Sequence, residues 1–137
     1  VMRLGMMFLV RAMLIAQVGF SALMILIGYA AMAGHLSDTV FFGCFVVWQI
    51  TVFFQAGMTL GNLAAIAQEP MGHIAGMAAS VIGSVATVVG VTLAIPVGLM
   101  FDGTPIPLAA AIFLEATLAL WLMRLMMQAD AQLSPAQ

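Results

Sequence analysis

The chain has 137 residues, of which 65% are hydrophobic and only 6% are charged, and its formal net charge is −2. Soluble domains average about 25% charged residues and keep much of their surface in water, so this composition excludes an ordinary soluble fold. The basic residues are three arginines, too few for a nucleic-acid-binding patch, and the single cysteine, Cys44, excludes a disulfide framework within the chain.

Long apolar runs separated by glycine and proline predict membrane-spanning helices. Residues 12–37, 39–68 and 74–101 carry no charged side chain, and the run 107–127 carries Glu115 well inside it. Each run reaches the roughly 20 residues needed to cross a hydrocarbon core. We therefore predict an all-α integral membrane fold of four transmembrane helices, near residues 8–33, 39–67, 73–101 and 107–127.

The few charges predict how this bundle is oriented. Arg3, Arg11 and Arg124 fall on one side of a four-span topology, whereas Asp38 and Asp102 fall in the two connections on the other side. The positive-inside rule then places both termini in the cytoplasm. Short connections predict that consecutive helices pack as antiparallel neighbours. The polar residues 128–137 are expected to form a disordered cytoplasmic tail.

Polar side chains recur along one face of the second predicted helix. They are Trp48, Thr51, Gln55, Thr59 and Asn62. Their spacing of three and four residues places them on one helical stripe, and polar groups facing lipid are costly unless they are bonded. We interpret this polar stripe as the lining of a substrate pathway. The alternative is that the same side chains hydrogen-bond to neighbouring helices.

The third predicted helix carries small residues at regular spacing. The stripe includes Gly76, Gly83 and Gly90, with serine, threonine or alanine between them. Small residues let two helix backbones approach closely in a membrane. We therefore predict that this small-residue stripe forms a tight helix contact.

Glu115 is the acidic residue inside a predicted span. An intramembrane carboxyl is a candidate proton site, and the alternative is a structural hydrogen bond to Gln17 or Ser21 of the first helix. His35 and His73 fall at opposite membrane faces, so they cannot share a metal or haem. No nucleophile–base pair is evident. We predict no enzyme activity, no cofactor and no metal site.

One segment resembles a known transporter family. Residues 61–80, GNLAAIAQEPMGHIAGMAAS, are similar to the tenth helix, cytoplasmic loop and eleventh helix of major facilitator superfamily drug exporters of the Bcr/CflA type. The segment Arg3-Leu4-Gly5-Met6 resembles the Arg-x-Gly element before the ninth helix. The resemblance covers nearly the whole chain, as helices nine to twelve of a twelve-helix transporter.

The resemblance implies a carboxy-terminal fragment of a proton-driven exporter of small amphipathic compounds, working by alternating access in the inner membrane. Its partners would be the bilayer, the small-molecule substrate and the missing amino-terminal helices. The tenth helix borders the transport cavity in this family, which favours a pathway role for the polar stripe. The twelfth is peripheral, which argues against a proton role for Glu115.

Two other functions are compatible with four apolar helices. The first is a complete four-helix exporter that works as a dimer, but such small exporters carry an essential carboxylate in their first helix, and residues 12–37 contain none. The second is a non-transporting membrane anchor or assembly subunit. An anchor has no need of a polar helix face, so the stripe from Trp48 to Asn62 counts against it.

Overall fold

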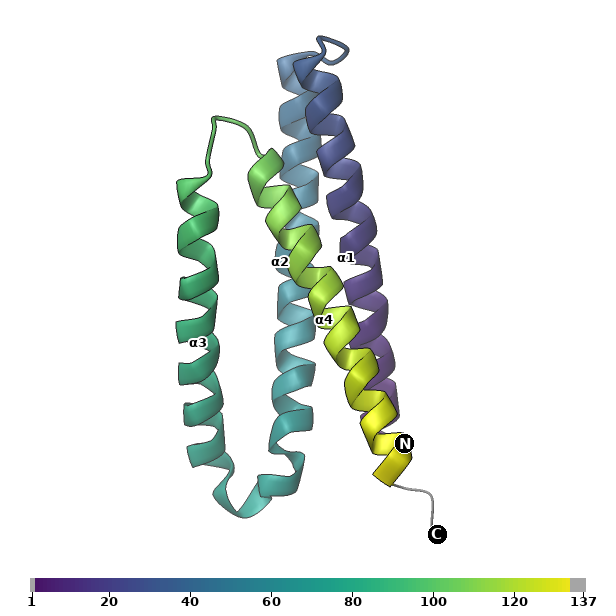
Figure 1. Cartoon of the computed structure of the whole chain (residues 1–137), viewed down its shortest axis with the longest axis vertical. Helices are drawn as coiled ribbons and strands as arrows, with labels where there is room; N and C mark the ends of the chain where they lie inside the picture. The colour runs from purple at the N-terminus through teal and green to yellow at the C-terminus, as the bar shows by residue number, and fades with distance from the viewer. Residues whose placement is uncertain (1, 134–137) are drawn as a thin grey trace.

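The computed structural model describes residues 2–133, with side chains described for 5–70 and 72–128. Its long helices are α1 (Met2–Met32), α2 (Asp38–Gln68), α3 (Ala75–Leu99) and α4 (Ile106–Leu133), and a short 3-10 helix, η1 (Glu69–Ile74), joins α2 to α3. The helices alternate in direction (Figure 1). Four segments are long and apolar enough to cross a membrane. The predicted set of four apolar helices is confirmed, and it is compatible with a multi-pass membrane protein.

Several predicted boundaries are wrong. α1 begins at Met2 rather than near residue 8, and α4 continues to Leu133 although a disordered tail was predicted from residue 128. Alanine, glutamine and leucine between 128 and 133 favour a helix, and no glycine or proline interrupts them. The rest of the predicted tail, 134–137, lies outside the described residues. The predicted loop after α2 is the 3-10 helix η1, with Pro70 in its first turn, where a missing backbone N–H costs least.

α1 is the helix around which the bundle packs. It runs alongside both α2 and α4. Its buried residues recur at alternating spacings of three and four, which places them on one face, here called the α1 seam. The seam consists of Met7, Val10, Leu14, Gln17, Ser21, Met24 and Gly28. It forms two apolar clusters, one of Val10 and Leu14 with Ala116, and one of Met24 with Trp48 and Ala109.

Gly28 ends the seam where the first residue of α4 packs against α1. A Cβ atom at this position would lie 2.7 Å from Cγ1 of Ile106, the first residue of α4. Only a residue without a side chain fits there while Ile106 keeps its place. The Ile106 side chain at the beginning of α4 therefore packs directly against the α1 backbone at Gly28.

Two short turns close the end of the bundle opposite the termini (Figure 1). Gly34 and Gly103 have positive φ values of +76° and +89°, a conformation that glycine adopts without strain. In the second turn, Asp102 Oδ1 accepts hydrogen bonds from Thr104 Oγ1 at 2.7 Å and Thr104 N at 2.9 Å. These bonds stabilise the carboxylate and hold the pKa of Asp102 below its usual value, the side-chain bond having the larger effect.

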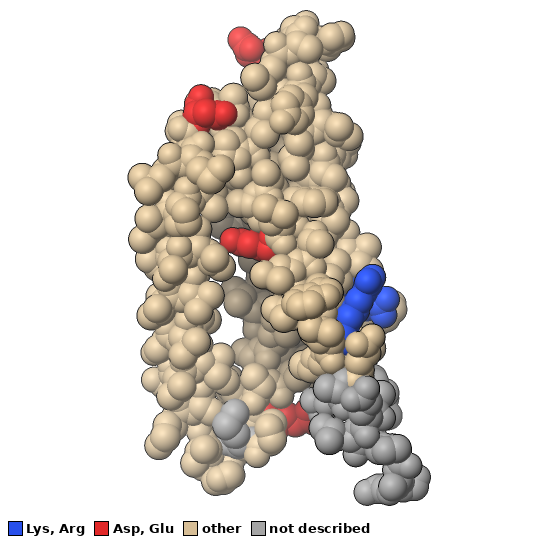
Figure 2. Space-filling model, in the orientation of Figure 1, with Lys and Arg blue, Asp and Glu red and all other residues tan. Residues whose placement is uncertain are grey.

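α3 stands apart from the other helices. It contacts α2 and α4 at only a few residues, and Ala78 is its one buried side chain among those described. Figure 2 shows openings between α3 and the rest of the molecule. The expectation that every helix packs closely on its neighbours in sequence is therefore wrong for α3. A short connection sets the antiparallel direction but supplies no complementary side chains along the helix.

The small-residue stripe of α3 makes no tight contact with the described residues. No atom outside the helix's own backbone lies within 4 Å of a Cβ built at Gly76, Gly83 or Gly90. Several hydroxyls of this helix bond back to their own helix, as Thr87 Oγ1 does to the Gly83 carbonyl at 2.8 Å. The predicted close helix contact thus requires a partner other than the described part of this chain, and it stays a prediction.

Candidate functional site

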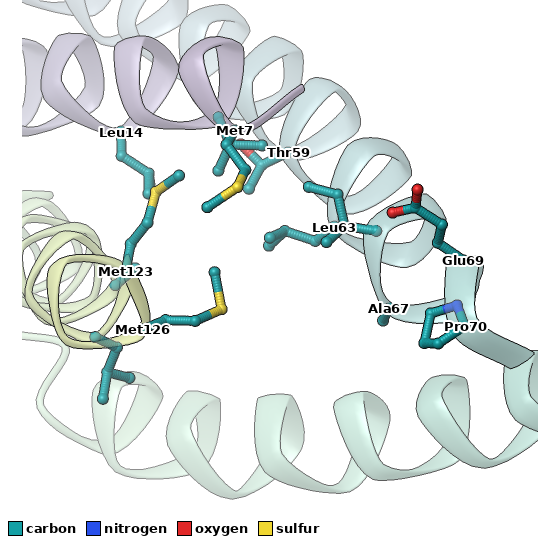
Figure 3. Close-up of a pocket in the computed structure, with 13 residues that line it drawn as sticks. Met7, Leu14, Thr59, Leu63, Ala67, Glu69, Pro70, Met123 and Met126 are labelled. Atoms are coloured by element: carbon teal, nitrogen blue, oxygen red, sulfur yellow. The ribbon is translucent and has the colours of Figure 1, made fainter. Parts of the chain in front are cut away.

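A large cavity lies toward the end of the bundle that carries the termini and η1. It has a volume of about 620 Å³, is open on one side and is lined by α1, α2, η1 and α4 (Figure 3). Pockets for drug-sized ligands typically hold about 300–1,000 Å³. Its lining residues are Met7, Val10, Leu14, Thr59, Leu63, Ile66, Ala67, Glu69, Pro70, Ala119, Leu122, Met123 and Met126. This space is referred to below as the main cavity.

The walls of the main cavity are apolar and rich in methionine. Met7, Met123 and Met126 extend into it from α1 and α4, and Leu63 faces them from α2 (Figure 3). Methionine is unbranched and polarisable, so its side chain adapts to ligands of different shapes. The side chains that bring polar atoms into this lining are Thr59 and Glu69. The cavity therefore suits molecules with a large apolar body and few polar groups.

Thr59 brings the polar stripe of α2 to the main cavity. Its side chain is buried, and its Oγ1 accepts a hydrogen bond from Nε2 of Gln55, one turn earlier in α2, at 2.9 Å. A hydroxyl that accepts one bond still has a hydrogen to donate. The bond from Gln55 therefore orients the Thr59 hydroxyl. That hydroxyl can donate its hydrogen to a molecule in the cavity.

Two other predicted pathway residues border a different space. Trp48 and Thr51 line a cavity of about 440 Å³ formed by α1 and α2. Trp48 packs against Met24 and Ala109, and its buried Nε1 has no hydrogen-bond partner among the described residues. Thr51 Oγ1 donates to the Trp48 carbonyl oxygen at 2.7 Å. The polar stripe is thus divided between two cavities.

Asn62, the last residue of the predicted stripe, is half-buried and bonds to its own helix. Its Nδ2 donates to the Met58 carbonyl oxygen at 2.6 Å, and it lines neither of the two cavities. The hydrogen bonds of Thr51, Gln55 and Asn62 all stay within α2. Within the described part of the chain, these contacts give no support to the alternative that the stripe bonds α2 to other helices.

Glu115 is exposed and has no hydrogen-bond partner among the described side chains. Its expected alternative partners, Gln17 and Ser21, bond to each other instead, with Gln17 Nε2 donating to Ser21 Oγ at 3.1 Å. That alternative is therefore wrong. The two α1 residues are 1% and 0% exposed, because the α1 seam encloses them. Glu115 precedes Ala119, a cavity-lining residue, by one turn of α4.

The α1 and α4 walls of the main cavity were not predicted from the sequence. Met7, Leu14 and Met123 are apolar residues within apolar spans, so their composition does not separate a cavity wall from a lipid-facing surface. One signal was available in α1. Gln17, Ser21 and Gly28 are polar or small and share the three-and-four spacing of the seam.

Neither metal-binding side chains nor comparison with known proteins identifies another site among the described residues. The described residues contain no group of three or more histidine, cysteine, aspartate or glutamate side chains that could hold a metal ion. No family model, curated protein or solved structure matches this chain. Among the described residues, the main cavity and the α2 residues beside it form the candidate functional site.

Proposed function

We propose that this protein belongs to a proton-driven membrane transporter of the major facilitator drug-exporter type, which exports small amphipathic compounds. The main cavity carries this proposal: about 620 Å³, walled by methionine and leucine, and reached by the polar stripe of α2 at Thr59. Such a space accepts varied apolar bodies while a single hydroxyl orients them. The resemblance of residues 61–80 to such exporters supports the same function.

The orientation of the chain fits export from the cytoplasmic side. Arg11 and Arg124 belong to the half of the bundle near the termini, and Asp38 and Asp102 belong to the opposite end (Figures 1 and 2). By the positive-inside rule we propose that the termini are cytoplasmic, in the inner membrane. The main cavity reaches η1 at that same end, so it would load from the cytoplasm or the inner leaflet.

We also propose that further helices complete the transporter. α3 offers a small-residue stripe that no described residue covers, and small-residue faces in membranes serve close helix packing. The missing helices of a twelve-helix transporter would supply this partner. A membrane anchor remains the weaker alternative, because α1, α2 and α4 could pack as an anchor without enclosing a cavity of drug-sized volume.

The proposal is tested by changing the polar group at the main cavity. Thr59→Val keeps the shape of the side chain and removes the hydroxyl, and Gln55→Ala removes the group that fixes it. Cells without other exporters would express the complete protein with each change. We expect membrane levels to be unchanged and resistance to hydrogen-bonding compounds to fall by about 2- to 10-fold, the effect of one hydrogen bond.

The matched control is Thr92→Val, which removes an exposed hydroxyl of α3 that lies off the small-residue stripe and bonds to its own helix. It should leave the export profile unchanged. An equal effect of Thr59→Val and Thr92→Val would count against the cavity as the pathway. Glu115→Gln tests proton coupling separately. We expect coupling to survive, and loss of all export at normal protein levels would place the coupling site in α4.

A further inference from the structure

Three buried side-chain atoms of α1 and α2 have no hydrogen-bond partner among the described residues. They are Oε1 of Gln17, Nε1 of Trp48 and Oε1 of Gln49. The two amide oxygens can only accept a hydrogen bond, and the indole N–H can only donate one. Buried polar atoms in proteins are bonded in the large majority, to protein or to ordered water, because an unsatisfied one costs stability. These three atoms therefore need a partner that both donates and accepts.

The three side chains belong to the same depth of the bundle. Gln49 follows the first residue of α2 by eleven residues, and Ser21 precedes the last residue of α1 by eleven residues. Both lie roughly 16 Å from the turn that joins the two helices, at 1.5 Å per residue. The bond from Gln17 Nε2 to Ser21 Oγ, at 3.1 Å, holds the Gln17 amide beside Ser21. The Gln17 amide is therefore level with Gln49 and with its neighbour Trp48.

The three side chains also face the same interior. Gln17 belongs to the α1 seam, and Trp48 belongs to the apolar cluster that joins this seam to α2 and α4. Gln49 comes four residues after Phe45 and three before Val52, and both of these pack against that cluster. This spacing places Gln49 on the same face of α2. The unsatisfied atoms are thus carried by helix faces that meet in the interior.

The polar residues of the seam lie between two apolar cavities. Leu14, which precedes Gln17 in the seam, lines the main cavity. Met24, which follows Ser21, lines the smaller cavity formed by α1 and α2. Gln17 and Ser21 line neither of these two cavities, and they are 1% and 0% exposed. A small polar molecule held here would be enclosed and would separate the two apolar spaces.

We propose that α1 and α2 hold a bound water molecule that donates to Oε1 of Gln17 and to Oε1 of Gln49 and accepts from Nε1 of Trp48. Buried waters typically make about three hydrogen bonds to polar groups that otherwise lack partners. Water has the two donors and the acceptor that these atoms require, whereas a direct bond from Trp48 to one amide would leave the other amide oxygen unsatisfied. The water would link α2 to α1, and the proposal is independent of the proposed export function.

The test uses the indole N–H of Trp48 as a probe for water. The chain has two tryptophans, and Trp121→Phe replaces the other one, which is 55% exposed. The full chain with this change and ¹⁵N-labelled tryptophan would be studied by NMR in detergent micelles. Laboratory-frame and rotating-frame Overhauser spectra together distinguish a dipolar contact with water from hydrogen exchange. We expect a dipolar cross-peak between the Trp48 indole N–H and water.

Four further variants identify what holds the water. Gln17→Met and Gln49→Met each remove one amide and keep an unbranched side chain, and each should weaken the cross-peak by about fivefold, the effect of one hydrogen bond. The matched control is Gln55→Met, because the Gln55 amide bonds to Thr59 instead, and it should leave the cross-peak unchanged. Ser21→Ala removes a hydroxyl whose exchanging hydrogen could relay the signal, and the cross-peak should persist.

Several results would overturn the proposal. Absence of the cross-peak in the folded Trp121→Phe chain would do so without any further variant, even where one of them fails to fold. A cross-peak that survives both Gln17→Met and Gln49→Met at full strength, or that disappears in Ser21→Ala, would refute the bound water as described. An equal effect of Gln55→Met would do the same. An indole resonance that shifts in Gln17→Met or Gln49→Met with no cross-peak to water would show a direct bond instead.

Discussion

α1 and α3 are both apolar helices with small residues on one face, yet only α1 is enclosed by its neighbours. The α1 seam alternates large, polar and small residues from Met7 to Gly28 and packs against two helices. The α3 stripe is the more regular pattern, but among the described residues no atom outside the helix's own backbone lies within 4 Å of a Cβ built at its glycines. A regular stripe of small residues therefore allows another helix to approach closely. Whether a helix packs there depends on complementary side chains on that helix.

The difference has a physical cause in the solvent. Lipid is as apolar as leucine, so burying an apolar face gains little, and helices associate where their shapes interlock. Gly28 provides such a fit because Ile106 occupies the space above it. Gly83 is flanked by small residues, but no side chain of the described chain projects toward it. A close helix contact needs a side chain on one helix as well as the space beside a small residue on the other.

The largest predicted effect comes from filling the gap at Gly28. Gly28→Leu forces a side chain into the position of Ile106 and should lower the free energy of unfolding by about 1–3 kcal/mol, as overpacking does. Gly83→Leu places the same side chain in open space and should leave the stability of this chain unchanged. Thermal unfolding of both variants in one detergent measures the pair.

An equal loss of stability in the two leucine variants of this chain would contradict the difference between α1 and α3. A Gly83→Leu variant that is harmless here but destabilises a larger assembly would show that a partner helix covers the α3 stripe. An unchanged melting temperature for Gly28→Leu would mean that α4 does not rest on α1 at this point.

A smaller effect is expected at the buried polar pair of the seam. Ser21→Ala removes the hydroxyl that accepts a hydrogen bond from Nε2 of Gln17. The other amide atom of Gln17, Oε1, already lacks a partner among the described residues. Leaving a buried amide unbonded should cost about 1 kcal/mol. Ser84→Ala on α3 is the control, because the Ser84 hydroxyl is exposed and bonds to the Ser80 carbonyl oxygen of its own helix. Equal stability of the two alanine variants would contradict the distinction between the buried seam of α1 and the exposed surface of α3.

The sequence predicted the four spans because charge and hydropathy mark them directly. Their ends were predicted less well. Residues 2–7 and 128–133 are helical although they lie outside the predicted spans, since a helix continues wherever its residues allow, independent of where the apolar run stops. The standing apart of α3 was not predictable from loop length, which constrains direction but carries no information on side-chain fit.

The cavity could be predicted only on its polar wall. Gln55 and Thr59 stood out from α2 because amides and hydroxyls contrast with an apolar span, and the structure does place Thr59 in the lining. Trp48 belongs instead to the packed core, where its large ring fills space between helices. The methionine walls had no contrast with the lipid-facing residues around them, so their position became visible only in three dimensions.

The polar face of α2 at Thr59, and not the stripe of α3, borders the space where we propose that exported molecules bind. The most direct test compares two single cysteines near the same end of the bundle, Ala67→Cys in the cavity lining and Gly76→Cys on the stripe, each with Cys44→Ser. Rates of labelling by N-ethylmaleimide would be measured with and without 9-aminoacridine or acridine. We predict severalfold slower labelling at position 67 with either dye, and no change at position 76. Equal slowing at both positions, or protection at position 76 alone, would show that the binding space does not lie beside the polar face of α2.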